Sequence, residues 1–239
     1  LDVFIADADG SNPKPLASHP DLDYNAAFSP DGQWIVFTSH REGSADLYRI
    51  HPDGSDLQRL TDHPAFDDAA AFSPDGKRLA FTSDRMEKGK HQLFVIDVEA
   101  GEARRVVETP TKVSQPAWSP DGQLLAFVAA DPETDDEKKR KEQHDDPRVA
   151  DEAPKFDRLC VADVAAGTSR QVTQGACHVW EFEWSPDGSQ FVLLTGPRPA
   201  DDGWFDAELS LVSADGGEPR RLVKTGKQFA APRWSPDGK

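Results

Sequence analysis

Cysteine, methionine and long apolar runs are all scarce in this chain of 239 residues. Its two cysteines, Cys160 and Cys177, form no Cys-x-x-Cys metal or redox motif and no disulfide framework. A single bridge between them stays open, but low cysteine usage favours a reducing compartment, so we expect a cytoplasmic protein. No apolar run approaches the ~20 residues that cross a bilayer, which excludes a membrane-spanning protein.

Basic side chains are outnumbered, with 27 Lys and Arg against 43 Asp and Glu, which gives a net charge of −16. A phosphate backbone is repelled by such a surface unless a basic face is segregated, so we expect no nucleic-acid partner. Six tryptophans and thirteen phenylalanines can bury a core, which argues against a wholly disordered chain. Residue 1 is Leu1 and the only methionine is Met86. The missing signal peptide therefore says little, because this does not resemble the start of a natural gene product.

A repeated motif organises the chain. Ser-Pro-Asp-Gly occurs five times, with its serine at positions 29, 73, 119, 185 and 235. An aromatic residue precedes each copy, and a short apolar run such as Leu79-Ala80-Phe81 follows each of the first four. Pro presets φ, Asp bonds its own backbone and Gly accepts positive φ, so the motif predicts a tight turn between two strands. The motif aspartates are therefore interpreted as turn residues: Asp31, Asp75, Asp121, Asp187 and Asp237.

A third and a fourth strand complete each repeat, as in residues 46–50 followed by 58–60. Four strands in ~40–50 residues are typical of a β-propeller blade, and such a sheet must stack on others to cover its faces. We therefore predict an all-β fold, a β-propeller of four-stranded antiparallel blades, with a sandwich or solenoid as the alternative. Full blades are expected at about 20–63, 64–110, 111–175 and 176–226.

The two ends of the chain predict partial blades at 1–19 and 227–239. The first would hold a third strand from Val3 to Ala6 and a fourth strand near Leu16. The second would hold a first strand from Ala230 to Trp234 and stop at its turn. Joined together they would lack a second strand, whose backbone partners must come from elsewhere. We therefore expect 1–239 to be a single propeller fragment, an incomplete arc whose exposed blade edges can self-associate.

A charged insertion at 131–156 links the second and third strands of one blade. It has hardly any apolar residues, so it cannot bury a face of its own. A short helix is expected between Glu133 and Gln143, supported by the pair Glu137 and Lys141. Acidic residues surround the basic run 138–141, which favours a solvated loop. The alternative is a flap at the propeller rim that contacts a partner domain.

Histidines and paired acids offer no convincing metal site. His19 and His63 occupy equivalent loop positions, which indicates a shared loop geometry rather than metal binding. Asp7-x-Asp9-Gly10 has the start of a calcium loop, but the expected glutamate at its twelfth position is Ser18, so a hairpin turn suffices. We predict no metal site and no cofactor.

Catalytic motifs are equally lacking, since the chain has no Gly-x-Ser-x-Gly elbow, no His-Glu-x-x-His and no phosphate-binding glycine loop. Arg41 and Arg85 recur at the same place after the second strand. They could reach a ligand in the channel, but their recurrence favours a role in tying down the loop. No catalytic, cofactor-binding or metal residue is predicted.

The aromatic-Ser-Pro-Asp-Gly unit resembles the repeat shared by TolB-type propellers and the propellers of prolyl oligopeptidase-family serine peptidases. The charged run 135–141, followed by 145–149, is similar to the acylaminoacyl-peptidase branch, as is the hairpin 211–222. In that family a propeller caps an α/β-hydrolase domain with a Ser-Asp-His triad and admits only short peptides. This chain has too few blades and no hydrolase domain, so no triad residue is carried over.

The resemblance implies a non-catalytic propeller region that restricts access to a hydrolase domain of the same parent polypeptide, with short peptides as passing substrates. Two alternatives stay open, a TolB-like propeller that binds another protein and a stand-alone enzyme that uses the channel. The paired glutamates that hold a substrate amine in dipeptidyl-peptidase relatives are not matched. Glu181 and Glu183 are separated by Phe182 and precede a turn, so strand alternation explains them better.

Overall fold

The structure is a computed structural model that describes residues 2–99, 101–142, 155–199, 201–223, 228–235 and 237–238. In this part of the chain strands dominate, with one α-helix, α1 (Asp135–Glu142), and one 3-10 helix, η1 (Asp201–Asp206). The predicted all-β fold class is confirmed. None of the described helices has the length and apolar character needed to span a membrane.

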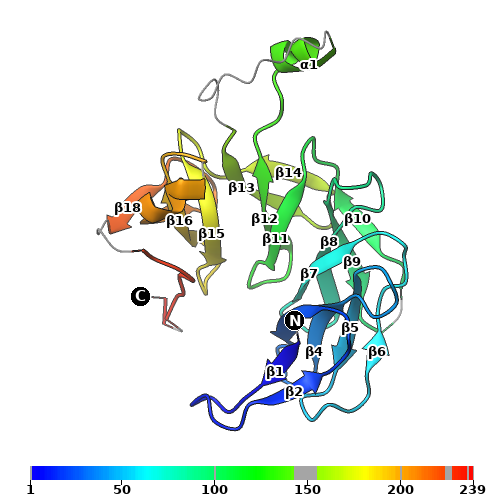
Figure 1. Cartoon of the computed structure of the whole chain (residues 1–239). Coiled ribbons are helices and arrows are strands. Elements are labelled where there is room, and N and C mark those ends of the chain that lie inside the picture. Colours follow the sequence, from blue (N-terminus) through cyan, green and yellow to red (C-terminus); the bar gives the residue numbers. More distant parts are fainter. Residues whose placement is uncertain are drawn as a thin grey trace. The chain divides into compact units, whose positions relative to one another are not determined.

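The chain forms two compact units, Leu1–Phe127 with Val161–Ser169, and Val128–Cys160 with Arg170–Lys239. A two-stranded antiparallel sheet opens the first unit, with β1 (Val3–Ile5) paired to β2 (Lys14–Ala17). Two four-stranded sheets follow (Figure 1), with the orders β3-β4-β5-β6 and β10-β9-β8-β7. Their strands are β3 (Asp23–Phe28), β4 (Ile35–Ser39), β5 (Asp46–Ile50), β6 (Gln58–Arg59), β7 (Asp67–Phe72), β8 (Arg78–Ser83), β9 (Gln92–Asp97) and β10 (Arg104–Val107).

Two further sheets have the same strand order. They consist of β11 (Val113–Trp118), β12 (Leu124–Ala130), β13 (Asp157–Asp163) and β14 (Thr168–Gln171), and of β15 (His178–Trp184), β16 (Gln190–Gly196), β17 (Glu208–Ser213) and β18 (Arg220–Val223). Neighbouring strands run antiparallel in the sheets β3–β6, β7–β10 and β15–β18. These are the meanders that the repeat predicts, whereas the blade boundaries themselves stay a prediction.

Both faces of the β3–β6 sheet are buried, which explains why every residue of β4 and β5 is buried. On one face Val36 and Leu47 pack in a cluster with Leu79, Phe81 and Phe94 of the next sheet. The opposite face packs on the two-stranded sheet through a second cluster of Val3, Leu16, Ala17, Ile35, Phe37, Tyr48 and Ile50. Alternate side chains of one strand thus serve two different layers, as expected for stacked blades.

The first strand of the blade carries a bulge at a recurring place. The register shifts within the β3–β4 and β7–β8 pairs, and a residue beside each shift has a left-handed backbone conformation, which residues other than glycine seldom adopt. The same conformation occurs four residues before four of the motif serines, at Asn25 (φ 53°), Ala69 (φ 55°), Gln115 (φ 55°) and Ala231 (φ 49°). Since asparagine, glutamine and two alanines all adopt it at this place, the strain is set by the blade geometry and not by local preference.

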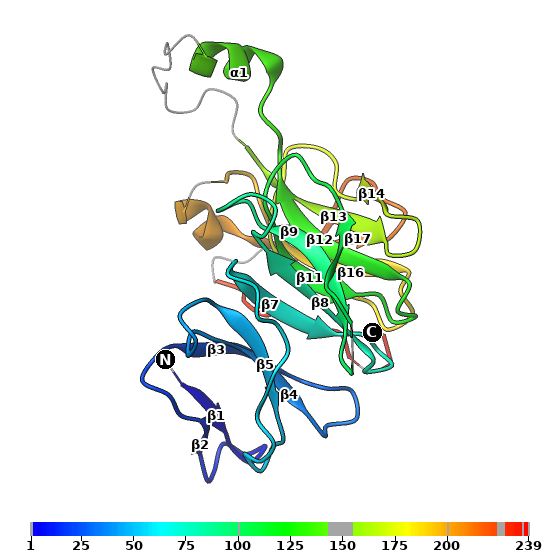
Figure 2. The ribbon, with the colours of Figure 1, turned by 90° about the vertical axis from the view of Figure 1, so that its right-hand side faces the viewer.

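The helix predicted in the insertion is confirmed as α1, between β12 and β13, and it stands clear of the sheets of its own unit in Figure 1 and Figure 2. Thr134 and Glu137 form a capping box, with Thr134 N donating to Glu137 Oε2 at 2.5 Å and Glu137 N donating to Thr134 Oγ1 at 3.3 Å. Lys155 Nζ lies 2.6 Å from Glu137 Oε2 and lowers the pKa of that carboxyl to about 2. The predicted partner Lys141 has its side chain outside the described residues.

The first strand predicted at Ala230 to Trp234 is wrong, because no strand occurs among the described residues 228–235. The segment nevertheless lies against β15, since Ala231 N donates to Glu181 Oε2 at 2.6 Å and Trp234 N donates to Glu183 Oε2 at 2.7 Å. Side-chain carboxylates, not a neighbouring backbone, bind these amides, and a proline at 232 has no amide to donate. A backbone ladder is therefore not formed there.

Candidate functional site

Each Ser-Pro-Asp-Gly motif closes its turn with its own side chains. Ser29 Oγ donates to Asp31 Oδ1 at 2.5 Å and accepts the backbone amide of Trp34 at 2.9 Å. Gly32, with φ at 69°, supplies the left-handed residue that the turn requires. The serine-to-aspartate bond recurs at 2.6 Å in the other four motifs, at 73–75, 119–121, 185–187 and 235–237. The interpretation of the aspartates as turn residues is confirmed.

These short bonds also fix the charge of the turns. The serine hydroxyl is the main cause that lowers the carboxyl pKa in the first four motifs. At Asp187, where Ser185 and Ser189 both donate, the pKa falls to about 2. Each of these turns therefore presents a carboxylate near neutral pH.

Arg41 and Arg85 hold their loops, as predicted from their recurrence. Arg41 Nη2 lies 3.1 Å from Asp23 Oδ1, and its guanidinium carbon is 4.8 Å from the centre of the Tyr48 ring. Arg85 Nη2 lies 2.8 Å from Asp67 Oδ2. Both aspartates are fully buried at the start of a first strand. Each arginine therefore clamps the end of its second strand to the first strand of the same blade.

The histidine and aspartate pairs also lie in loops. His19 Nδ1 accepts the amide two residues ahead at 3.3 Å, and His63 Nδ1 does the same at 3.0 Å, which confirms a shared loop geometry. Asp9 Oδ1 accepts the amide of Ser11 at 2.9 Å within a hairpin turn. Among the described residues no group of three or more His, Cys, Asp or Glu is placed to hold a metal ion.

The second unit contains both cysteines and the two glutamates Glu181 and Glu183. Cys160 and Cys177 are free thiols, so the bridge that the sequence left open is not formed. Burial raises the pKa of Cys160 to about 11. Glu181 and Glu183 are occupied by the backbone of residues 231 and 234, a role that strand alternation did not predict.

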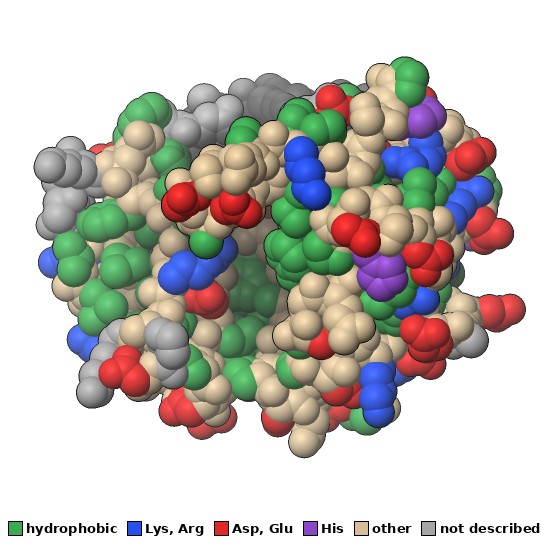
Figure 3. Space-filling view, turned by 90° about the horizontal axis from the view of Figure 1, so that it is seen from below, with side chains coloured by type: hydrophobic (Ala, Val, Ile, Leu, Met, Phe, Trp, Pro, Cys, Tyr) green, Lys and Arg blue, Asp and Glu red, His purple; other side chains and the backbone are tan. Residues whose placement is uncertain are grey.

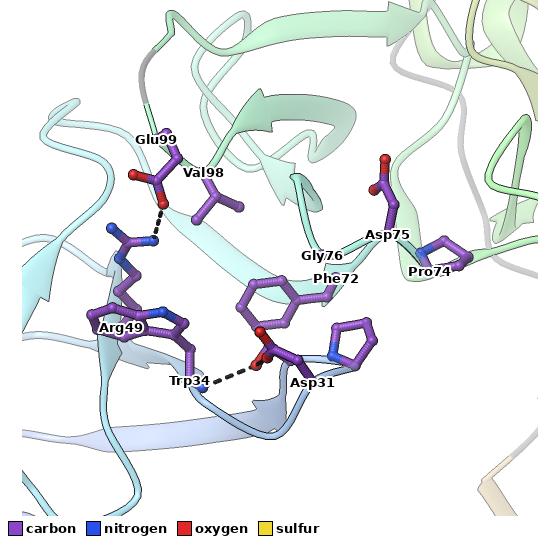
Figure 4. Close-up of a pocket in the computed structure, with 11 residues that line it drawn as sticks. Asp31, Trp34, Arg49, Phe72, Pro74, Asp75, Gly76, Val98 and Glu99 are labelled. Atoms are coloured by element: carbon purple, nitrogen blue, oxygen red, sulfur yellow. Dashed lines mark hydrogen bonds and ion pairs between the residues drawn. The ribbon is translucent and has the colours of Figure 1, made fainter.

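A groove of about 400 Å³ lies along one edge of the boundary between the sheets β3–β6 and β7–β10, within the first unit. In Figure 4, Trp34 and Arg49 lie together on one side, Pro74 and Asp75 lie on the other, and the Phe72 ring lies between them. Its apolar lining is Pro30, Trp34, Phe72, Pro74 and Val98, and its charged lining is Asp31, Asp75, Glu99 and Arg49. Sequence reasoning missed this groove because two different blades contribute its walls.

The one arginine that lines this groove is already engaged. Arg49 Nη1 lies 3.0 Å from Glu99 Oε1, its Nε donates to Gln58 Oε1 at 2.8 Å, and its guanidinium lies 4.2 Å from the centre of the Trp34 ring. The opposing carboxylates of Asp31 and Asp75 have lowered pKa values and are charged. The groove therefore combines an apolar floor with an excess of negative charge, which suits a cationic group on an apolar stem.

Charges of both signs lie together on one face of the molecule. On the face of the molecule shown in Figure 3, Lys and Arg side chains are interspersed with Asp and Glu. No single basic patch stands out among the described residues on that face.

Comparison with known proteins assigns the repeat. The TolB beta propeller domain family, PD40, matches residues 2–154. The chain belongs to this TolB beta propeller family. The Tol-Pal system protein TolB of Desulfosudis oleivorans is 36% identical over 50 residues, which is 21% of this chain and 11% of that protein. The propeller predicted from the Ser-Pro-Asp-Gly repeat is thus confirmed.

Solved structures share the PD40 propeller fold at low identity. TolB from Acinetobacter baumannii matches with a TM-score of 0.70 and 20% identity, covering 98% of this chain and 51% of that one. The acylaminoacyl peptidase of Pyrococcus horikoshii matches with a TM-score of 0.61 and 15% identity, covering 86% of this chain and 33% of that one. The chain thus spans about half or less of these proteins. At such identities the likeness shows the fold alone, and one fold hosts many functions.

Proposed function

We propose that this chain is the non-catalytic propeller region of a serine peptidase of the acylaminoacyl type. Its role is to restrict which peptides reach an α/β-hydrolase domain of the same polypeptide. Stacked rigid sheets supply the steric barrier, and acidic grooves such as the one at Trp34 bias what is bound on the way.

The observation that carries the proposal is the charged insertion between β12 and β13. Its sequence is similar to the acylaminoacyl branch, and it forms a capped helix that protrudes from the sheets, held at its base by the ion pair of Lys155 and Glu137. A protruding helix built only of charged residues is suited to contact a neighbouring domain or to cover an entrance, because it buries no core of its own.

The test uses the full-length parent protein. A fluorophosphonate probe should label it covalently, and it should hydrolyse an acyl-amino-acid nitroanilide, whereas this chain alone should do neither. Replacing 133–154 by a short Gly-Ser linker should raise the rate on long peptides relative to short ones. The matched control replaces the unrelated β8–β9 loop, 86–90, and should leave that ratio unchanged. Absence of labelling of the intact parent would exclude the peptidase.

A second candidate is a TolB-like propeller that binds another protein through loops on one face. The 36% identity to TolB of Desulfosudis oleivorans over 50 residues favours it. In that case the parent should resist the fluorophosphonate probe and should be cross-linked to a protein partner in its native cells. A labelled active-site serine in the parent would remove this candidate.

Location and assembly remain predictions under either proposal. We propose a cytoplasmic protein, which fractionation of the source cells tests directly. We also propose self-association through unpaired strand edges of this chain. Light scattering that shows a folded monomer across a wide concentration range would count against it.

A further inference from the structure

The chain contains its own example of how a groove between two blades is filled. Five residues after the motif serine stands Trp34 in one blade and Arg78 in the next. The guanidinium carbon of Arg78 lies 4.5 Å from the centre of the Trp118 ring, on the following blade of the same unit. Arg78 Nη2 also donates to the carbonyl of Gly122, in the following turn, at 2.9 Å. An arginine therefore occupies this boundary by stacking on an aromatic ring and bonding a glycine carbonyl.

The groove at Trp34 has the same parts but no such arginine. Phe72 and Gly76 stand where Trp118 and Gly122 stand one blade later. Trp34 itself lies against Arg49 at 4.2 Å and stacks on His51 with ring centroids 3.8 Å apart. Trp34, the counterpart of Arg78, is thus held against one wall of the groove and does not fill it.

The two glycines show the same difference. A Cβ on Gly122 would lie 3.6 Å from Arg78 Nη2, so the guanidinium rests against the turn. A Cβ on either glycine would also meet the motif proline of the preceding blade, Pro74 Cδ at 3.5 Å from Gly122 and Pro30 Cδ at 3.7 Å from Gly76, but at Gly76 no arginine lies within 4 Å. Between β7–β10 and β11–β14 the Arg78 guanidinium fills a space. The equivalent space between β3–β6 and β7–β10 is part of the 400 Å³ groove.

We propose that the Trp34 groove binds an arginine side chain of a polypeptide, placed as Arg78 is placed one blade later. This rests on the proposed function, in which polypeptides meet the propeller, and it names the side chain that is recognised. Asp31 and Asp75 supply negative charge, while Arg49 is already neutralised by Glu99. A planar guanidinium can stack on Phe72 and donate to a carbonyl together, which an ammonium cannot do as well.

Binding is tested with N-acetyl-arginine-methylamide against its lysine and citrulline counterparts, followed by NMR of the tryptophan indole signals. A ligand of this size should bind with an affinity on the order of millimolar. Arginine should bind at least about tenfold more tightly than citrulline, which keeps the shape but lacks the charge. Equal binding of the three compounds, or binding of none, would overturn the proposal.

Trp34→Arg tests the place of binding, because the new side chain should fill the groove as Arg78 does. Arginine binding should be lost at least about tenfold. The matched control is Gln33→Arg, which adds the same charge at the exposed neighbouring position outside the groove lining and should leave binding unchanged. Retained binding in Trp34→Arg, or equal loss in both variants, would contradict the assignment.

Chemical rescue gives an independent readout if Trp34→Arg does not fold. Arg78→Ala should empty the neighbouring groove and lower the melting temperature. Ethylguanidinium should then restore it by more than the same concentration of ethylammonium, with the intact chain as the reference for solvent effects. No preference for the guanidinium would refute the chemistry. Failure here while the parent still hydrolyses acyl peptides would leave the proposed function standing.

Discussion

Replacing Arg85 should destabilise the fold strongly, and replacing its partner as well should restore most of the stability. Asp67 is fully buried, and its Oδ2 lies 2.8 Å from Arg85 Nη2. Its other oxygen, Oδ1, is buried without a hydrogen-bond partner among the described residues. Arg85→Leu therefore leaves the buried carboxylate of Asp67 without its ion-pair partner. Removal of one partner of a buried pair costs ~3–5 kcal/mol, and the Arg85 side chain is 14% exposed, so we expect ~3 kcal/mol.

The double variant Asp67→Val with Arg85→Leu should lie within ~1 kcal/mol of the parent chain, because well-packed apolar residues replace a buried ion pair at little net cost. The chain offers a precedent, since Val113 occupies the position of Asp67 in the next blade, six residues before the motif serine, and is itself buried. Leucine at 85 can still cover the Phe94 ring, above which the guanidinium lies at 4.8 Å.

Urea unfolding followed by tryptophan fluorescence measures both effects. With an m-value of ~2 kcal/mol/M, the single variant should shift the midpoint down by ~1.5 M, and the double variant by ~0.5 M or less. The coupling energy from the double-mutant cycle should be at least ~2 kcal/mol. A loss below ~1 kcal/mol in Arg85→Leu, or additive losses in the double variant, would refute the view that Arg85 neutralises a buried charge.

Three further predictions follow from single sites. In urea unfolding, Ala69→Asn should raise the stability by ~0.5 kcal/mol and Ala69→Val should lower it by ~1 kcal/mol, because φ is 55° there; the reverse order would exclude strain at the bulge. Asp187 has a folded pKa of about 2, against ~3.9 when unfolded, so its stabilisation is present above pH ~4 and is lost as pH falls to ~2. Asp187→Asn should therefore be less stable than the parent chain at pH 6, and a gap that persists at pH 2 would contradict this. Cys160, with a pKa of about 11, should react with iodoacetamide at pH 8 at least ~100-fold more slowly than glutathione, as peptide mass spectrometry can measure. Comparable rates would show that burial does not suppress the thiolate.

The strands and turns were predictable because their causes are local. Ser, Asp and Gly of each motif close the turn within a few residues, so the pattern of Asp31 applies unchanged at Asp121. Arg41 and Arg85 could be assigned to loops because repetition in equivalent places is hard to reconcile with a single ligand site. The repeated motif and the residues at equivalent positions in each repeat therefore carried most of the structural information in the sequence.

Other features depend on residues distant in the chain and were not predictable. Nothing in alanine favours a left-handed backbone, so the bulge at Ala69 was not foreseen. The groove at Trp34 exists because the Trp34 side chain stacks within its own blade and does not fill the space beside the next blade. The closing segment failed as a strand because Glu181 and Glu183 bind its amides with side chains.

The side-chain bonds of Ser29 and Asp31 draw their partners from six consecutive residues, and those of the motifs at 73, 119 and 185 repeat this arrangement. A blade that is duplicated or deleted during evolution thus carries its hairpin lock with it and borrows nothing from its neighbours. Gene rearrangements can alter the number of blades without first inventing a new way to close each one. The boundary between two blades is a further place of change, because the residue five after the motif serine is Arg78 at the filled boundary and Trp34 at the groove.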